Sequence, residues 1–302
     1  MAGPTGPLQV VVTGLGDTTL DAVAGFVAAR QQDPTAHVVL VGDDAGPLAE
    51  ELAGMAGWRE RLLVARSRDG ALVGVVLADV DDALRRVWWV GPWVASGRPD
   101  AARVAAALLA AADAAHAGAW DEEEYAPDVR NELVADLAVR RGATADTGSA
   151  VLVLDPLVVP ATEAHGPSVR PVAAADHAAV AALHDALFPN THTRGEDLVV
   201  ASDTHVSVVD GGHGTAAGYV AVQVQPDGSG YVDYLGVVAD ARGAGLGRVL
   251  VAGALRRLAD EGAGRAHLTV RVDNHAARAL YASLGFVEER VVVPYRRGFS
   301  LG

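Results

Sequence analysis

A short segment of alternating glycines, ARGAGLGR, runs from Ala241 to Arg248 between two apolar stretches. Glycine tolerates positive φ and lets a ligand approach the backbone, so Gly243, Gly245 and Gly247 favour a tight, open loop. Successive N–H groups in such a loop form a concave anion site. A helix that begins there adds its unpaired N–H groups and its positive dipole end. Together with the two arginines, the segment predicts a site for a phosphate or pyrophosphate.

The composition excludes several other kinds of site. The chain has no lysine, which excludes a P-loop, and its G-x-G-x-G spacing differs from the dinucleotide fingerprint G-x-G-x-x-G. It also has no cysteine, which excludes disulfides, thiolate metal sites and a cysteine nucleophile. No histidine or carboxylate spacing is typical of a metal centre, so the sequence predicts no metal.

Two motifs in this part of the chain resemble those of the Gcn5-related N-acetyltransferase (GNAT) superfamily. The first has the form V-x(4)-[RQ]-G-x-G-x-[GA] and consists here of Val237, Arg242, Gly243, Gly245 and Gly247. The second has the form N-x(5)-L-Y-x(3)-G-F and consists of Asn274, Leu280, Tyr281, Gly285 and Phe286. They occur in the family's order and spacing, and the resemblance covers residues 168–297.

The resemblance implies acetyl-CoA as the cosubstrate and assigns roles to individual residues. Backbone groups of Leu235 and Val237 would pair with the pantetheine arm, and Asn274 would contact it. Tyr281 would lie near the thioester sulfur and protonate the leaving thiolate. Gly236, inside a strand, predicts a bulge or a close backbone approach. The pyrophosphate would be held by amides of Arg242, Gly243, Ala244, Gly245, Leu246, Gly247 and Arg248.

Amine acylation also requires a group that accepts the proton of the amine. An alkyl ammonium with a pKa near 10 is only about 0.1% neutral at pH 7. Asp233 is the candidate base, because a period of two places it on the same strand face as Leu235 and Val237, with Tyr231 on that face too. A solvated or salt-bridged aspartate is the competing interpretation. His184 and His192 flank the segment 185–190, which the resemblance places near the acceptor, and we interpret both as surface or packing residues.

The element pattern of the second half predicts how these residues are positioned. Apolar spacing predicts strands at 168–172, 205–212, 215–230, 231–238, 267–272 and 286–296, and helices at 174–188, 245–262 and 273–285. Asp176 is the expected cap of the first helix, Asp273 or Asn274 that of the last, and Gly262 closes the middle helix. The fold class is α/β (α+β), with a mixed, mostly antiparallel sheet flanked by helices.

The first half repeats this pattern at an offset of 143 or 144 residues, which predicts an internal duplication. RPDAARVA, residues 98–105, lies opposite the glycine loop but has no glycine, and Pro99 lacks an N–H donor. Ala138 lies opposite Tyr281, and Val90 opposite Asp233. We therefore expect two tandem GNAT-like domains, a degenerate and non-catalytic one at 1–155 and a catalytic one at 168–302, joined by a proline-rich linker at 156–167. This layout is similar to that of mycothiol synthases.

Charge and hydropathy limit the partners. The net charge of −14 argues against nucleic-acid binding, and most of it lies in residues 1–165, which could attract a cationic substrate. No apolar run is long enough to span a membrane, and the N-terminal segment lacks the features of a signal peptide. These features predict a cytoplasmic protein, either a monomer or a homodimer.

The function predicted from the sequence is acetyl-CoA-dependent acetylation of a primary amine on a small molecule, by direct attack in a ternary complex. Two alternatives remain open. One is a non-catalytic acyl-CoA-binding regulatory protein, which would need no proton donor at Tyr281. The other is a protein N-acetyltransferase, which would need a wide acceptor groove.

Overall fold

The computed structural model describes residues 8–160, 167–189, 191, 193–210, 216–225 and 227–298. The chain forms two compact units, Ala150–Glu289 and a first unit made of Met1–Ser149 with Arg290–Gly302. The boundaries of these units differ from the domain boundaries predicted from the sequence, 1–155 and 168–302. The difference arises because the last residues, Arg290–Gly302, belong to the first unit. Residues 161–166 of the expected linker lie outside the described residues.

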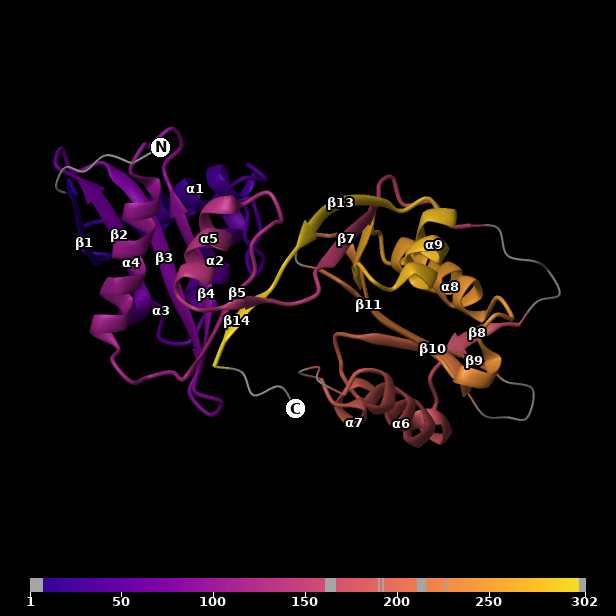
Figure 1. Ribbon diagram of the computed structural model, residues 1–302. Coiled ribbons are helices and arrows are strands. Elements are labelled where there is room, and N and C mark those ends of the chain that lie inside the picture. Colours follow the sequence, from indigo (N-terminus) through magenta and orange to yellow (C-terminus); the bar gives the residue numbers. More distant parts are fainter. Residues whose placement is uncertain are drawn as a thin grey trace. The chain divides into compact units, whose positions relative to one another are not determined.

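The second unit contains the glycine loop. Within the described residues its sheet has seven strands in the order β13-β7-β12-β11-β10-β9-β8 (Figure 1). The strands are β7 Ser149–Leu154, β8 Val169–Pro171, β9 His205–Asp210, β10 Ala216–Val224, β11 Gly230–Val237, β12 Ala266–Arg271 and β13 Val287–Val292. The helices are η1 Ala174–Asp176, α6 His177–Leu187, α7 Gly195–Leu198, η2 Ala239–Ala241, α8 Leu246–Asp260 and α9 His275–Ser283.

Helices cover both faces of this sheet (Figure 1). On one face α8 lies so close that a Cβ on Gly218 would be 3.0 Å from Leu250, and one on Gly230 would be 2.6 Å from Leu258. On the other face Val180 of α6 belongs to the same buried cluster as Tyr219 of β10. The two faces of β10 and β11 can therefore be told apart by which helix their side chains meet.

A bulge and a divergence of strands interrupt the middle of the sheet. β10 and β11 are antiparallel, but Ala221 pairs with Tyr234 and Val222 with Val232, which leaves Asp233 as the extra residue. The parallel pairing of β11 with β12 extends only from Gly230 to Val232. Beyond that point no described strand pairs with the backbone of β11 on its β12 side. The bulge lies at Asp233 and not at Gly236.

The first unit repeats the architecture, as the duplication predicts. Its sheet has the order β1-β2-β3-β4-β5-β14-β6 over the part of the chain that the structure describes. The strands are β1 Val10–Gly14, β2 Leu62–Ser67, β3 Leu72–Asp81, β4 Arg86–Val94, β5 Glu122–Tyr125, β6 Thr144–Ala145 and β14 Tyr295–Arg297. The helices are α1 Leu20–Gln31, α2 Ala45–Gly54, α3 Trp58–Arg61, α4 Ala101–Ala115 and α5 Glu132–Arg140.

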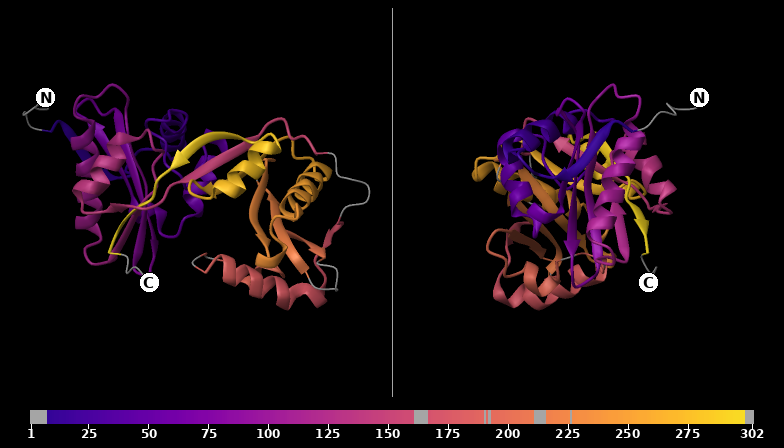
Figure 2. Two further views of the ribbon diagram at one scale, coloured as in Figure 1. Left: turned by 45° about the vertical axis from the view of Figure 1, so that its right-hand side comes forward. Right: turned by 90° about the vertical axis from the view of Figure 1, so that its left-hand side faces the viewer.

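The strand expected over 286–296 is two strands in two sheets. β13 belongs to the second sheet, whereas β14 lies between β5 and β6 in the first. The yellow C-terminal segment that carries both strands can be followed from one unit into the other (Figure 2). Ionic contacts hold β14 there, since Arg297 pairs with Glu123 and Arg296 with Glu124. Glu123 is fully buried and also accepts hydrogen bonds from Trp89, Tyr125 and Arg141. A buried carboxylate needs such partners, so this cluster is the main polar anchor of the C-terminal strand.

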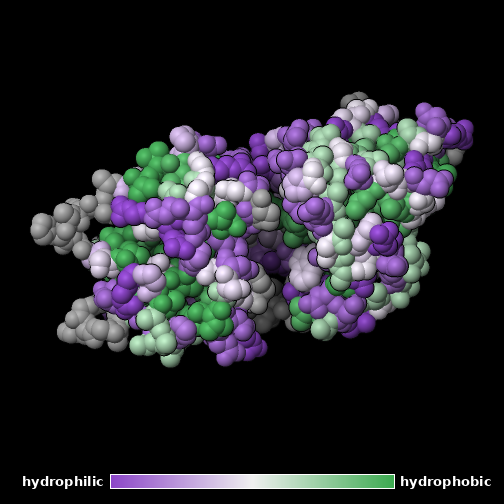
Figure 3. Space-filling model, turned by 180° about the vertical axis from the view of Figure 1, so that it is seen from behind, coloured by the Kyte–Doolittle hydropathy of each residue, from purple (hydrophilic) through white to green (hydrophobic). Residues whose placement is uncertain are grey.

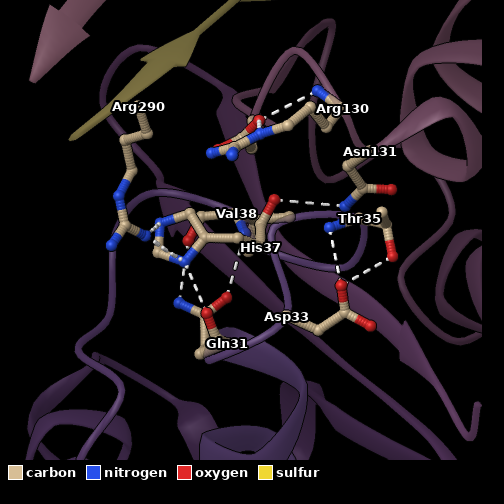
Figure 4. A network of polar contacts seen from close by, with 9 residues as sticks. Gln31, Asp33, Thr35, His37, Val38, Arg130, Asn131 and Arg290 are labelled. Carbon is tan, nitrogen blue, oxygen red and sulfur yellow. Dashed lines mark hydrogen bonds and ion pairs between the residues drawn. The ribbon is translucent and has the colours of Figure 1, made fainter. Parts of the chain in front are cut away.

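A second polar network fixes the residues just before β14. The buried imidazole of His37 donates through Nδ1 to the carbonyl of Gln31 (3.0 Å), which leaves Nε2 to accept from Arg290 at 2.6 Å (Figure 4). Burial, followed by the charge of Arg290, lowers the pKa of His37, which favours the neutral ring that this contact requires. Asn131 donates to the His37 carbonyl (3.1 Å) and caps α5.

The surface mixes polar and apolar side chains. In the space-filling view hydrophilic and hydrophobic residues are interspersed over the visible face (Figure 3). In the described part of the chain, no helix combines the length and the apolar character needed to cross a bilayer.

Candidate active site

A cavity of about 620 Å³ in the second unit collects nearly all the residues expected to hold a cofactor. Of the ten predicted, only Ala244 is not part of its wall. The predicted residues in the wall are Leu235, Val237, Arg242, Gly243, Gly245, Leu246, Gly247, Arg248 and Asn274. The remaining wall comes from Leu187, Phe188, Ala241, Ala276, Ala277 and Leu280.

Two of the three loop glycines adopt the conformation expected of them. Gly243 has φ +81° and Gly245 has φ +79°, and no atom would lie within 4 Å of a Cβ on either. Gly245 caps α8, so the amides of Leu246 and Gly247 have no acceptor inside the helix. Gly247 itself is helical, and a Cβ there would be 3.1 Å from Leu280 of α9. The third glycine thus serves close helix packing and does not use the positive φ that glycine tolerates.

Both arginines of the loop keep their charge available. The Nε of Arg242 donates to the carbonyl of Val237 (3.1 Å), and Arg248 donates to the hydroxyl of Ser283 (2.6 Å). Neither guanidinium forms an ion pair with any described residue, unlike Arg265, which pairs with Asp227 at 2.7 Å. Two uncompensated cations beside free helix N–H groups favour an anion in the cavity.

Gly236 provides the close approach that its position predicts, although toward protein and not toward a ligand. A Cβ there would be 2.5 Å from the ring of Tyr219 and 2.9 Å from Leu187. This contact also fixes the faces of β11, because Tyr219 lies on the α6 side. Gly236 therefore faces α6, and Leu235 faces the opposite side.

Asp233 lies at the bulge, half-buried, and outside the wall of the cavity. Gly230 faces α8, so Tyr231 faces the α6 side, opposite to Leu235. The expectation that Tyr231 shares a face with Leu235 and Val237 was therefore wrong, because the bulge interrupts the period of two. The charge of Asp233 lies close enough to contribute, after burial and Tyr234, to the raised pKa of Tyr219.

Helix α9 positions Asn274 and Tyr281. The Oδ1 of Asn274 accepts from the amide of Ala277 (3.1 Å), so Asn274, not Asp273, caps the helix. Tyr281 is 6% exposed and its ring meets Phe286 edge-on at 5.7 Å. Burial raises the pKa of Tyr281 to about 12, so its hydroxyl stays protonated at neutral pH.

The Tyr281 hydroxyl has no hydrogen-bond partner among the described residues. Within the same residues the only fully buried side-chain polar atom without a partner is Arg30 Nε, so the hydroxyl of Tyr281 must reach solvent. Tyr281 is not part of the cavity wall, but the preceding Leu280 is. An unpaired, protonated and accessible hydroxyl can donate a proton.

Sequence patterns did not reveal an aromatic cluster beside the cavity. His184 is fully buried on α6, and its ring lies 4.6 Å from that of Tyr234 and 5.4 Å from that of Phe188. His184 is thus a packing residue, as expected, but with both ring nitrogens hydrogen-bonded. His192 lies outside the described residues. Asp176 stands at the start of α6, but its carboxylate bonds Ala173 and Arg170 instead of capping the helix.

The first unit differs at the corresponding positions. Gly74 pairs with Val94 as Gly218 pairs with Val237, so Pro92 corresponds to Leu235 by register, and it has no N–H to offer. Trp93, 1% exposed, corresponds to Gly236. Helix α5, capped by Asn131, carries Ala138 at the position of Tyr281.

Comparisons with known proteins point to one family. Residues 177–286 match the acetyltransferase (GNAT) family. Curated relatives include mycothiol acetyltransferases from Saccharopolyspora erythraea, 38% identical over 85 residues, and Kocuria rhizophila, 48% identical over 67 residues. The matched stretches cover 28% and 22% of this chain, and the same shares of the relatives. The chain thus spans about a quarter of the length of the curated relatives it matches.

Two solved structures share the fold over nearly the whole chain. A GCN5-related N-acetyltransferase from Sphaerobacter thermophilus has a TM-score of 0.73 at 16% identity, covering 96% of each chain. A tandem GNAT protein from the clavulanic acid biosynthesis pathway has a TM-score of 0.62 at 18% identity, covering 97% of this chain and 99% of its own. The chain therefore has the fold of these tandem GNAT structures, with one GNAT-like fold in each half. Among the described residues, no cluster of three or more His, Asp or Glu is placed to hold a metal ion.

Proposed function

We propose, from the match of residues 177–286 to the GNAT family, that the chain is an acetyl-CoA-dependent N-acetyltransferase acting on a primary amine of a small molecule. The observation that carries the proposal is the cavity, because it joins the glycine loop, the open edge of β11 and the start of α9 in one site. Each of these elements offers a different kind of group to one long anionic thioester.

The cofactor would lie along this wall. Amides from Gly243 to Gly247 and the two loop arginines would hold the pyrophosphate, since both guanidiniums lack ion-pair partners among the described residues. Peptide groups of Leu235 and Val237 would pair with the pantetheine where β12 diverges from β11. Asn274 would contact the pantetheine through its side-chain NH₂, because its oxygen caps α9.

The reaction would proceed by direct attack. The ammonium of the acceptor loses a proton to Asp233, directly or through water, and the neutral nitrogen forms a bond to the thioester carbon. The bond from carbon to sulfur would then break, and Tyr281 would give its proton to the CoA thiolate. The second proton that the nitrogen loses as it becomes the amide would restore the Tyr281 hydroxyl, and Asp233 would pass its proton to solvent. The unpaired hydroxyl of Tyr281 supports this role, and burial, which raises its pKa, keeps the group protonated at any physiological pH.

We propose that only the second half, residues 168–302, carries out this chemistry. In the first half, residues 1–155, Pro92 removes a donor from the edge that would pair with pantetheine. Asp100 occupies the N-cap of α4, where the second half has Gly245, and Ala138 replaces the tyrosine. The linker 156–167 would then separate an active domain from an inactive one.

We propose a small primary amine as the acceptor. Its cationic form would be attracted by the net charge of −14 that the chain carries. Nucleic acid and membrane are not expected partners, and the active form would be a monomer or a homodimer in the cytoplasm. Some relatives are named mycothiol acetyltransferases, so the amine that those proteins acetylate is one acceptor to test with this chain.

The decisive experiment is turnover of acetyl-CoA by the full chain over amino sugars, aminoglycosides and amino acid derivatives, followed by release of free thiol. Acetylation of at least one amine by the wild type and its loss in Gly245→Asp would support the proposal. Tight CoA binding without turnover of any amine would instead favour an acyl-CoA-binding regulator. Acetylation of peptides only would favour a protein N-acetyltransferase.

A further inference from the structure

The connection between α6 and α7 comprises residues 188–194, of which 188, 189, 191, 193 and 194 are described. It is attached to the sheet by a hydrogen-bonded pair of aromatic residues, His184 and Tyr219. The Nε2 of His184 lies 3.0 Å from the carbonyl oxygen of Thr193. A carbonyl can only accept, so Nε2 carries the hydrogen. In the neutral ring Nδ1 must then accept, and the hydroxyl of Tyr219 lies 2.7 Å from it. One tautomer thus links α6, β10 and the connection.

Further contacts hold the same connection at other points. The hydroxyls of Thr191 and Tyr234 lie 2.6 Å apart. At the start of α7 the amide of Gly195 donates to Asp185 of α6 (2.8 Å), and a Cβ on this glycine would be 2.3 Å from the carbonyl oxygen of Ala181. The described residues of the connection, 188, 189, 191, 193 and 194, therefore have little room to shift as long as these bonds persist.

Three described residues at the end of α6 and in the connection lie in turn along β11, from the cofactor end toward the bulge. Leu187, at the end of α6, lies against the position of Gly236, next to the residues expected to hold pantetheine. Four residues later Thr191 reaches Tyr234, which directly follows Asp233. Between them Phe188 lines the cavity and meets the ring of Tyr234 at 5.1 Å. The far end of the connection is thus beside the candidate base, where an amine must arrive.

We propose that His184 and Tyr219 are a positioning pair that holds the α6–α7 connection against β11 and thereby sets the affinity for the amine acceptor, not for CoA. The inference rests on the proposed acetyltransferase function for its kinetic part only. The loop that would bind the pyrophosphate lies on α8, and no bond of the pair reaches it.

Hydrogen–deuterium exchange on the full chain tests the positioning without any activity. His184→Phe removes both bonds, Tyr219→Phe removes one and keeps the ring, and His184→Gln keeps an acceptor and a donor. Loss of a buried hydrogen bond should speed exchange at the amides of Thr191 and Gly195, which donate to Phe188 and Asp185, roughly 5- to 10-fold in the two Phe variants, with little change at residues 243–248. His184→Gln should restore slow exchange. Equal exchange in wild type and both Phe variants would overturn the proposal.

Kinetics with the best amine of the turnover panel test the second part. The two Phe variants should raise the KM for this amine about 10-fold and leave the Kd of CoA, measured by calorimetry, within about 2-fold. Tyr125→Phe is the matched control, since Tyr125 is 1% exposed and donates to Glu123 at 2.6 Å in the other unit. A parallel rise in the Kd of CoA, or an equal effect of the control, would refute acceptor-specific positioning. If the wild type acetylates no amine, the proposed function fails, and the exchange data still decide the positioning.

Discussion

Replacement of Tyr281 by phenylalanine separates a catalytic role from a structural one. The hydroxyl has no described partner, so its removal leaves no buried group unpaired, while the ring keeps its contact with Phe286. We expect the free energy of unfolding at pH 7 to change by less than about 1 kcal/mol. A general acid contributes about 10²- to 10⁴-fold, so kcat should fall by at least about 100-fold. The Kd of CoA should not change.

The pH dependence of stability gives a second, independent signature. The folded-state pKa of about 12 exceeds the ordinary value of 10, so the folded chain retains a proton that the unfolded chain loses between these values. The stabilisation is complete below pH 10 and is lost as the pH rises toward 12. A difference of two between the folded and unfolded pKa corresponds to about 2.7 kcal/mol in the free energy of unfolding. Tyr281→Phe should remove this part of the alkaline loss of stability.

The assays are thiol release with the best amine and urea unfolding at pH 7, 10 and 11. Tyr295→Phe is the matched control, because Tyr295 is half-buried in the first unit and has no proposed role. It should leave kcat within about 2-fold, as expected of a substitution away from the site. A Tyr281→Phe protein that retains more than a tenth of the wild-type kcat would refute the assignment of Tyr281 as the proton donor.

Other predictions test the loop, the base and the anchor of β14. Gly245→Ala, at φ +79° with open space around it, should cost about 1–2 kcal/mol and raise the Kd of CoA about 10-fold by calorimetry. Gly228→Ala, at φ +78° and equally open, should leave that Kd unchanged, and an equal effect of both would contradict a specific loop role. Asp233→Asn should lower kcat/KM more at pH 7 than at pH 10, where an amine of pKa near 10 is half neutral, and a uniform loss would exclude the base role. Glu123→Gln should lower the free energy of unfolding by about 1–3 kcal/mol in a thermal melt, because it removes the charge of a fully buried carboxylate that accepts from Arg141, Tyr125 and Trp89. Glu122→Gln, on a more exposed pair, should lower it by about 1 kcal/mol or less, and similar values for both would contradict the anchor.

Local chemistry explains which parts of the site the sequence predicts well. A left-handed glycine, an asparagine cap and a helix start depend on residues within one turn, so Gly243, Gly245 and Asn274 have the expected geometry. The tandem fold is likewise predictable, because two similar orders of strands and helices recur at a constant offset. These features need no knowledge of which strands pair.

Pairing over long distances accounts for what the sequence does not predict. The bulge at Asp233 depends on how β10 and β11 align, and a strict period of two therefore misplaces Tyr231. Placement of β14 in the first sheet depends on Glu123, more than 170 residues earlier in the chain. Nothing near Pro294 indicates this partner. The pairing of His184 with Tyr219 is similarly invisible, since only the fold brings α6 onto β10.

The register also explains why the chain has one glycine loop and not two. In the second unit a tyrosine on β10 faces a glycine on β11, whereas the first unit has Val75 at the position of Tyr219 and Trp93 at that of Gly236. The large ring has moved to the strand that would bind the cofactor, where the indole of Trp93 donates to Gln31 at 3.1 Å. The core stays filled, and the edge, with Pro92 beside it, has lost a donor. Under the proposed function, pantetheine would find one donor fewer at this edge, and a phosphate loop there would hold a cofactor less well. We therefore propose that activity resides in the second half, because a shared fold alone does not carry function and the few side chains and donors of the site differ between the halves.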